Sequence, residues 1–333
     1  MSESSNDSTK SQQIRPLPLS VPPGERGQPI KGPDALIGDI IAERFRITEV
    51  LGVGGMGAVY GVDDLVSGEL LALKLLRRTA LNRENRRRFR REISAAARVR
   101  HPHLVRVYAH GTHHSSPFLV MERLEGETLQ ARLQRRGALP VVECVVITLQ
   151  LLDALSAVHA SGFLHRDVKP SNVFLCDRGS DVHEVRLIDL GLARSLGSSM
   201  LPTPDEEHTS LTATGVIPGT PAYLAPEQVV GARDLDERVD VWAAGLTLYE
   251  MLVGHRVFTN RVFDELVKDI VYREVPAPSS RGVSGLPADF DPLLRQALAR
   301  DRQARFASCN AFRTALVALW SRYRATGLQK SDP

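Results

Sequence analysis

The most informative stretch of the sequence is "HRDVKPSN", residues 165–172. Three charged side chains, two hydrogen-bonding side chains and a proline share its eight positions, and no apolar stripe runs through it. We therefore interpret the stretch as a rigid loop that carries chemistry, not as core. Asp167 can accept a proton or orient a hydroxyl group, Lys169 can neutralise charge on a phosphoryl group in transfer, and Asn172 is a neutral oxygen ligand for a hard cation.

A second acidic position follows along the chain. The apolar run "VRLI", residues 185–188, predicts a strand that ends at Asp189, before Leu190 and Gly191. A carboxylate at a strand end beside a flexible glycine is typical of a metal-holding position. Taken singly, an Asp–Lys pair is usually a surface ion pair and Asp-x-Gly is usually a turn. The order and separation of these residues favour one composite site.

A glycine-rich stretch, "LGVGGMGAVY" at 51–60, places Gly52, Gly54 and Gly57 in the spacing that dinucleotide-binding folds also use. In those folds the third glycine opens a helix, whereas here "AVY" continues as a strand into the turn "DDLVSGE". We therefore expect the glycines at a hairpin tip, where backbone amides can approach phosphate oxygens. An ordinary glycine-rich hairpin is the alternative.

Lys74 lies on the next predicted strand, in "LALKLL" at 71–76. A lysine flanked by leucines on a buried strand is costly unless it is paired with an anion. The expected partners are phosphate groups and Glu92, which lies on a helix predicted in the arginine-rich segment that follows. The alternative is that Lys74 points outward and exposes its ammonium group to solvent.

The composition and the pattern of apolar residues change along the chain. Residues 1–38 are too rich in Ser, Pro, Gly and charge to offset their ordering entropy, so we expect a disordered leader, with a polyproline-type docking motif as the alternative. From Arg44 short apolar runs predict strands joined by hairpins. After Thr128 helices dominate, and we predict them at 128–135, 141–161, 238–253, 261–269, 289–299 and 308–322.

Composition excludes several classes of protein. The hydrophobic content of 43% and charged content of 24% are those of an ordinary globular protein. A net charge of +3 over 333 residues is too small to indicate nucleic-acid binding. The N-terminus has no apolar core of a signal peptide, and the longest apolar stretch, 141–155, is interrupted by polar residues, so we expect no membrane span. The three cysteines, in no metal or redox spacing, fit a reducing compartment, and we expect a cytoplasmic protein.

Together these motifs resemble the eukaryotic-like (Hanks-type) serine/threonine protein kinases, in particular their bacterial branch, from residue 44 to about residue 320. "GTPAYLAPE" at 219–227 is similar to the end of the family's activation segment. Asp240, in "DVWAAG", resembles the residue that braces the catalytic loop, and Arg305 resembles the arginine that pairs with Glu227.

The resemblance implies an α+β, bilobal fold. A small N-terminal lobe, 39–124, would hold a five-stranded antiparallel sheet with one helix, and a larger, mainly helical lobe would span 125–322 before a flexible tail at 323–333. ATP and Mg²⁺ (or Mn²⁺) are the implied cofactors. Protein substrates are the implied partners, and a transient homodimer would allow autophosphorylation.

The resemblance also implies a role for each site residue. Lys74 and Glu92 would position the phosphates, Asp167 would orient the attacking hydroxyl, and Lys169 would steady the γ-phosphoryl charge. Asn172 and Asp189 would hold the metal. The nucleotide would contact Leu51, Gly52, Gly54, Gly57, Val59, Ala72, Lys74, Glu122, Leu124 and Phe174. Several of these, and Met121 behind the adenine, are equally at home as core residues.

Substrate class and regulation follow from the same resemblance. Lys169 two residues after Asp167, with Thr220 before the Pro-Glu pair, is the serine/threonine pattern. Residues 192–218 have no helical or strand period, which favours a functional loop. A phosphate on this loop would pair with Arg166 and order the segment. The expected acceptors are Thr212 and Thr214, then Thr209 and Ser210.

Two alternatives of another class stay open. A catalytically silent scaffold usually lacks the lysine or one of the two aspartates, whereas Lys74, Asp167 and Asp189 are all present here. A small-molecule phosphotransferase would lack the segment that ends in "APE". Arg123, at a hinge position where an aromatic residue is more common, is a departure that bears on nucleotide fit.

Overall fold

The computed structural model describes residues 33–54, 57–76, 99–114, 116–177, 184–189, 221–283 and 285–328. The chain divides into two compact units. The N-terminal unit contains the described residues before residue 77 together with Val107–Arg123, and the C-terminal unit contains the remainder. Each unit has its own hydrophobic core.

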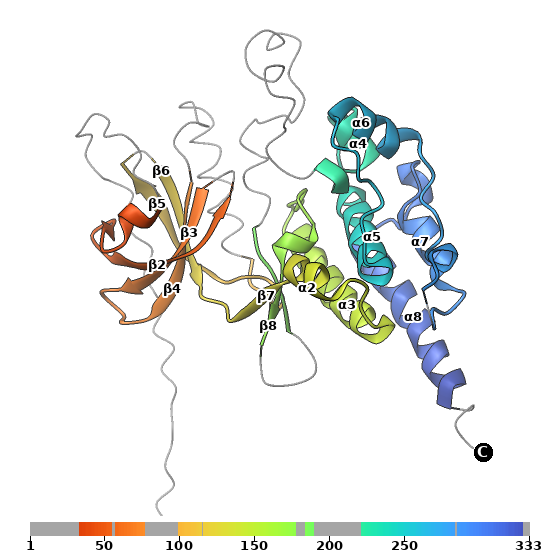
Figure 1. Ribbon diagram of the computed structural model, residues 1–333, viewed down its shortest axis with the longest axis horizontal. Coiled ribbons are helices and arrows are strands. Elements are labelled where there is room, and N and C mark those ends of the chain that lie inside the picture. Colours follow the sequence, from red (N-terminus) through yellow and green to blue (C-terminus); the bar gives the residue numbers. More distant parts are fainter. Residues whose placement is uncertain are drawn as a thin grey trace, which may run out of the picture. The chain divides into compact units, whose positions relative to one another are not determined.

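The N-terminal unit is built on an antiparallel sheet with the strand order β1-β2-β3-β4-β6-β5 (Figure 1). Its elements are the short 3-10 helix η1 (Pro33–Leu36), β1 (Ile40–Ile41), β2 (Phe45–Gly54), β3 (Gly57–Asp64), β4 (Leu70–Leu76), β5 (Val107–His113) and β6 (Ser116–Glu122). The prediction of five strands is therefore corrected to six. The extra strand, β1, has only two residues, too few for alternation to reveal, and it pairs with Phe45 and Arg46 of β2.

Side-chain alternation gives this sheet two different faces. One face packs the core of the N-terminal unit, with Tyr60, Leu73, Phe118 and Val120 almost fully buried. Lys74 points to the other face, because it alternates with Leu73 along β4. We call this second side of the sheet the lysine face.

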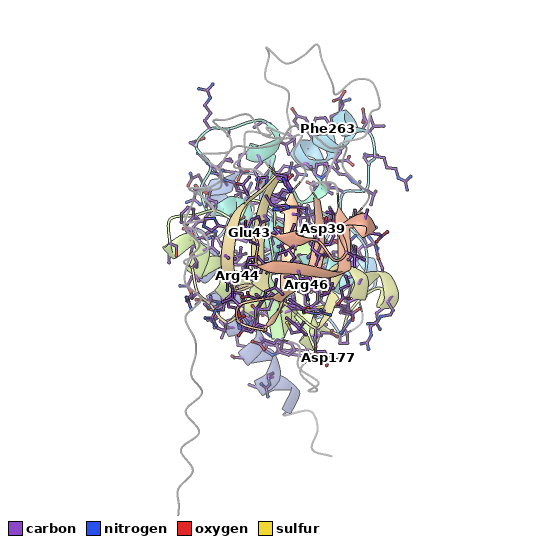
Figure 2. All side chains as sticks on the ribbon, turned by 90° about the vertical axis from the view of Figure 1, so that its left-hand side faces the viewer. Asp39, Glu43, Arg44, Arg46, Asp177 and Phe263 are labelled. Atoms are coloured by element: carbon purple, nitrogen blue, oxygen red, sulfur yellow. The ribbon has the colours of Figure 1, made fainter. Side chains whose placement is uncertain are left out.

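A buried ion pair lies at the turn of the β3–β4 hairpin. Arg44 donates two hydrogen bonds to the fully buried carboxylate of Asp64, from Nε at 2.7 Å and Nη2 at 2.6 Å. The Val66 amide and the Ser67 hydroxyl donate further bonds to the same carboxylate. Arg44 and its neighbour Arg46, at the start of β2, are labelled in Figure 2. Burial alone would raise the pKa of Asp64, but these donors outweigh it and lower the pKa to about 2.

The Arg44–Asp64 pair predicts acid sensitivity. The folded pKa of Asp64 lies below the ordinary value of 3.8, so its stabilisation is complete above that value and is lost as the pH falls toward 2. The shift corresponds to about 2 kcal/mol. Thermal melts from pH 6 to pH 2 should therefore show the gap between wild type and Asp64→Asn closing by about this amount. The stability gap between wild type and Arg44→Met should close over the same pH range. A gap that stays constant with pH would contradict the lowered pKa of Asp64.

The C-terminal unit is mainly helical (Figure 1). Its helices are α2 (Leu129–Arg136), α3 (Val141–Ala160), α4 (Pro226–Val229), α5 (Arg238–Val253), α6 (Phe263–Tyr272), α7 (Phe290–Ala297) and α8 (Cys309–Leu328). A small antiparallel sheet of β7 (Gly126–Thr128), β8 (Val173–Cys176) and β9 (Glu184–Leu187) accompanies them. Short 3-10 helices are η3 (Pro170–Asn172), η5 (Pro221–Tyr223), η6 (Pro278–Arg281) and η7 (Arg302–Ala304).

Helices α3 and α5 form the centre of this unit. Every residue of α5 from Val239 to Leu252 is buried, as expected of a helix that is apolar on all sides. Helix α3 is long and apolar enough to cross a membrane by length and composition, yet half of that apolar window is buried inside the protein. It packs against α5, α8 and β9. Its apolar surface therefore serves the core of the C-terminal unit.

The helices lie close to their predicted positions. One difference is α8, which continues to Leu328 into the segment that we expected to be a flexible tail. Its polar last turns contain Arg and Ala, both good helix formers, and Gly327 interrupts them only near the end. Most of the predicted leader and of the arginine-rich helix falls outside the described residues.

Candidate functional site

The loop at 165–172 is held by its backbone. Asp240, in the first turn of α5 and fully buried, accepts hydrogen bonds from the amides of His165 and Arg166, both at 2.8 Å. Arg166 has φ of 63°, in the left-handed region that non-glycine residues seldom adopt. The two bonds to Asp240 maintain this turn, so the predicted bracing role of Asp240 is confirmed.

Asp240 is itself held by a histidine. Nε2 of His159, at the end of α3, lies 2.7 Å from Oδ2 of Asp240, and its Nδ1 lies 3.1 Å from Oε2 of Glu237. Burial disfavours the protonated ring, but the hydrogen bond and charge of Asp240 outweigh it and raise the pKa of His159. Burial would likewise raise the pKa of Asp240, yet the bond to His159 lowers it. The pair is therefore a buried ion pair beneath the loop.

Asp167 is the centre of the polar groups on the loop. Nζ of Lys169 donates to its Oδ2 at 2.8 Å, and Nδ2 of Asn172 donates to the same oxygen at 3.0 Å and to the Asp167 backbone carbonyl at 2.7 Å. The Asp167 amide donates to Nδ1 of buried His165, whose pKa burial lowers. The Lys169 and Asn172 side chains predicted from the spacing thus both contact Asp167, whose carboxylate is oriented by two donors.

The strand that ends near Asp189 is tied to this loop. The Ile188 amide donates to the Asn172 carbonyl at 2.8 Å, which places the neighbouring residue Asp189 beside Asn172. Asp189 has φ of 65°, a left-handed conformation that aspartate tolerates better than most residues.

The donor set here fits a hard divalent cation. The Asn172 amide nitrogen is used by Asp167, so the amide oxygen is the atom of this side chain left to ligate a cation, and the carboxylate of the neighbouring Asp189 is a second oxygen ligand of the required type. Within the described ranges, no cluster of three or more His, Cys, Asp or Glu side chains could hold a metal. One carboxylate and one amide oxygen, completed by substrate oxygens and water, is an arrangement that Mg²⁺ accepts.

The glycine stretch forms the predicted hairpin tip. Gly54 and Gly57 pair across the β2–β3 turn. A Cβ atom built on Gly57 would lie 2.1 Å from the Leu75 carbonyl oxygen, so glycine is required there by the protein itself. A Cβ on Gly52 would meet nothing within 4 Å, and one on Gly54 only the Gly57 carbonyl at 4.0 Å. No neighbour among the described residues therefore requires glycine at 52 or 54.

These three glycines predict two separate effects. Gly57→Ala should destabilise the protein by about 2–3 kcal/mol, because its methyl group collides with backbone. Gly52→Ala and Gly54→Ala should change stability by less than about 0.5 kcal/mol while raising the KM for the predicted nucleotide. Thermal melts and initial-rate kinetics on all three variants check this. Equal loss of stability in all three, with KM unchanged, would contradict it.

The lysine face carries a row of predicted nucleotide contacts. Cross-strand partners in register share a face, and here the registers are Val59 with Lys74, Lys74 with Leu119, and Ala72 with Met121. Ala72 and Met121 are buried but are not part of the core of the N-terminal unit. Lys74 is half-buried beside them. The face thus offers an apolar surface with a cation next to it.

The remaining predicted nucleotide contacts are divided between the N-terminal and the C-terminal unit. Leu51, on β2, is exposed, and Glu122 ends β6. Leu124 begins the C-terminal unit, and Phe174 lies on β8 of that unit, paired with Thr128. Several predictions fall outside the described residues: Glu92, Leu190, Gly191, Thr209, Ser210, Thr212, Thr214 and Thr220.

A second predicted pair anchors the end of the activation-segment motif. Arg305 donates to both carboxylate oxygens of Glu227, at 2.6 and 2.8 Å, and its side chain is fully buried. Its guanidinium also donates to three backbone carbonyls and stacks over the Trp242 ring at 4.9 Å. The predicted pairing is confirmed.

Sequence reasoning missed His159, Glu237 and Glu49. His159 is the only ionisable residue in the last turn of an otherwise apolar helix, which is a weak signal for a buried partner. Glu49 lies on β2 and pairs with Arg123, and nothing in the spacing of these two residues links them.

Comparison with known proteins agrees with this geometry. The family described as "Protein kinase domain" matches residues 45–317. The chain is 36% identical over 290 residues to serine/threonine-protein kinase PknL of Mycobacterium tuberculosis, covering 86% of this chain and 68% of that protein. It is 35% identical to "Probable serine/threonine-protein kinase PknB" of Bifidobacterium longum, of which it spans 40%. The crystal structure of the M. tuberculosis PknI kinase domain matches with a TM-score of 0.66 and 29% identity, covering 85% of this chain and 98% of that one.

Proposed function

From the premise that this chain belongs to the protein kinase family, in its bacterial serine/threonine branch, we propose that it transfers the γ-phosphoryl group of ATP to serine or threonine hydroxyls of protein substrates. The hydroxyl oxygen attacks the γ-phosphorus, the bond to the β-phosphate oxygen breaks, and ADP leaves as the hydroxyl proton is lost.

The observation that carries the proposal is the geometry around Asp167. A carboxylate that accepts bonds from Lys169 and Asn172 on a loop fixed by Asp240 is suited to orient a hydroxyl and to receive its proton. Lys169, 2.8 Å from that carboxylate, lies where it can offset negative charge on a transferring phosphoryl group. Both roles need no movement of the loop, because its backbone is already held.

In this proposal Asn172 and Asp189 hold Mg²⁺. A divalent cation supplies charge neutralisation at the phosphate oxygens when bound. Lys74, on the lysine face with Val59, Ala72 and Met121, binds phosphate oxygens while the apolar neighbours receive the base. Mn²⁺ is the expected substitute because it also prefers oxygen ligands.

The direct test is transfer of labelled γ-phosphate to a generic basic protein, followed by phosphoamino-acid analysis. Label on phosphoserine and phosphothreonine, dependent on Mg²⁺ and abolished by a chelator, is the expected result. Nucleotide binding without transfer to any protein would instead favour the silent scaffold. Transfer to a small hydroxyl compound but to no protein would favour the small-molecule phosphotransferase.

We further propose activation by autophosphorylation at Thr212 or Thr214. These threonines precede "GT" at 219–220 in a segment with no secondary-structure period, and a phosphate there would be attracted by the positive charge of Arg166, which precedes Asp167. After incubation with ATP, phosphopeptide mapping should find phosphate on one or both. The Thr212→Ala/Thr214→Ala double variant should lose at least about tenfold in kcat, the scale that follows from losing one or two charge-assisted hydrogen bonds. Unchanged kcat in the double variant would refute this.

A further inference from the structure

The ion pair between Glu49 and Arg123 crosses the lysine face of the N-terminal unit. Nη1 of Arg123 lies 2.8 Å from Oε1 of Glu49. Arg123 directly follows β6, and Glu49 lies on β2, two strands that are separated in the sheet by β3 and β4. The Arg123 side chain therefore spans intervening strands to reach its partner. We call this pair the strap.

Gly61, on β3, lies beneath the strap. A Cβ atom at Gly61 would lie 2.9 Å from Cγ of Glu49 and 3.1 Å from Nη1 of Arg123. Glu49 pairs in register with Gly61, and Gly61 pairs with Ala72, so the strap lies on the face that carries Ala72. A glycine inside a strand often marks a close approach by another group. Here the strap is that group.

The lysine face is ordered along its length. The glycine hairpin tip pairs with the Leu76 end of β4, the row of Val59 and Lys74 comes next, and the row of Ala72 follows. The strap lies at the Gly61 row, on the side of Lys74 away from the hairpin tip. A nucleotide with its phosphates at Lys74 places its base over Ala72, beside the strap.

We infer that the strap is a nucleotide-positioning element that bounds the base subsite, an inference that rests on the proposed function. It places two opposite charges at this edge of the base subsite, and the missing side chain of Gly61 leaves room for them. Because the base is held equally before and during transfer, loss of the strap raises the KM for ATP and leaves kcat unchanged. The side chains are 30% and 49% exposed, so the effect is modest, about two- to fivefold.

The test compares ATP kinetics in four variants of the full chain. Arg123→Gln and Glu49→Gln remove the attraction, and Gly61→Ala displaces the pair with a methyl group. Each should raise the KM for ATP about two- to fivefold at constant kcat. The charge-swapped double variant, Glu49→Arg with Arg123→Glu, should return KM to within about twofold of wild type, which a merely structural loss would not do. Glu265→Gln, which removes the exposed pair with Lys268 on α6, is the matched control and should leave KM unchanged.

Two results would overturn the inference. One is a wild-type KM in all three single variants when wild type itself turns over ATP, which leaves the proposed function intact. The other is a charge-swapped variant no better than the single variants while its melting temperature equals that of wild type. Wild-type protein that neither binds nor consumes ATP would overturn the proposed function and this inference together.

Discussion

Asp167→Asn is expected to reduce kcat for phosphoryl transfer by about 10²–10⁴-fold, the range that a lost general base produces. The amide keeps the shape of the carboxylate but has neither the charge nor the basicity to receive a proton. Its oxygen can still accept the bond from Lys169 that the carboxylate accepts now. The loop is held by Asp240 and not by the Asp167 side chain, so folding should be unaffected. Initial-rate kinetics with labelled ATP measure the loss.

The control separates chemistry from binding. Asp167→Asn should bind ATP with an affinity within about threefold of wild type and melt within about 0.5 kcal/mol of it. Asp264→Asn, an exposed carboxylate on α6, removes one negative charge elsewhere and should retain full turnover. Substantial transfer by Asp167→Asn would show that Asp167 does not receive the hydroxyl proton, and it would contradict the catalytic role proposed for this loop.

Arg305→Met should destabilise the protein by about 3–5 kcal/mol. It leaves the carboxylate of Glu227 without its buried partner and three backbone carbonyls without their donor. Arg305→Lys should also cost stability, because one ammonium cannot reproduce the bidentate contact and the stacking on Trp242. For a chain of this size each kcal/mol corresponds to about 2–4 °C in Tm.

Arg302 provides the matched comparison in the same segment. It also donates to an aspartate, Asp234, but that carboxylate is 72% exposed and the pair is solvated. Arg302→Met should therefore cost much less stability than Arg305→Met. Calorimetry on the two variants checks the contrast. Equal destabilisation by Arg302→Met and Arg305→Met would show that burial does not determine how much each ion pair contributes to stability.

Local pattern predicted the positions of the long elements. Helix α5 begins and ends where apolar periodicity placed it, because Gly254 takes a left-handed conformation that stops the helix. The hairpin of β2 and β3 followed from the glycines and the absence of a helix after Gly57. In the site, the contacts among Asp167, Lys169 and Asn172 followed from spacing within one short loop.

Long-range pairings could not be predicted in the same way. The strap joins residues 74 positions apart, and a register irregularity between Ile47 and Glu49 changes the face of β2 on which Glu49 lies. The contact of His159 with Asp240 joins α3 to α5 across a similar separation. β1 was missed because two residues show no alternation. Such features depend on packing and register, which local sequence does not specify.

The brace formed by Asp240 has a consequence for variants of this protein. Asp240 binds the main-chain amides of His165 and Arg166, groups that almost every residue type carries, so this hold on the loop does not involve the side chain at 167. On the role proposed for Asp167, one substitution at this position is expected to stop turnover and to leave a correctly folded copy that competes for the same protein substrates. The architecture makes dominant-negative forms accessible in a single mutational step.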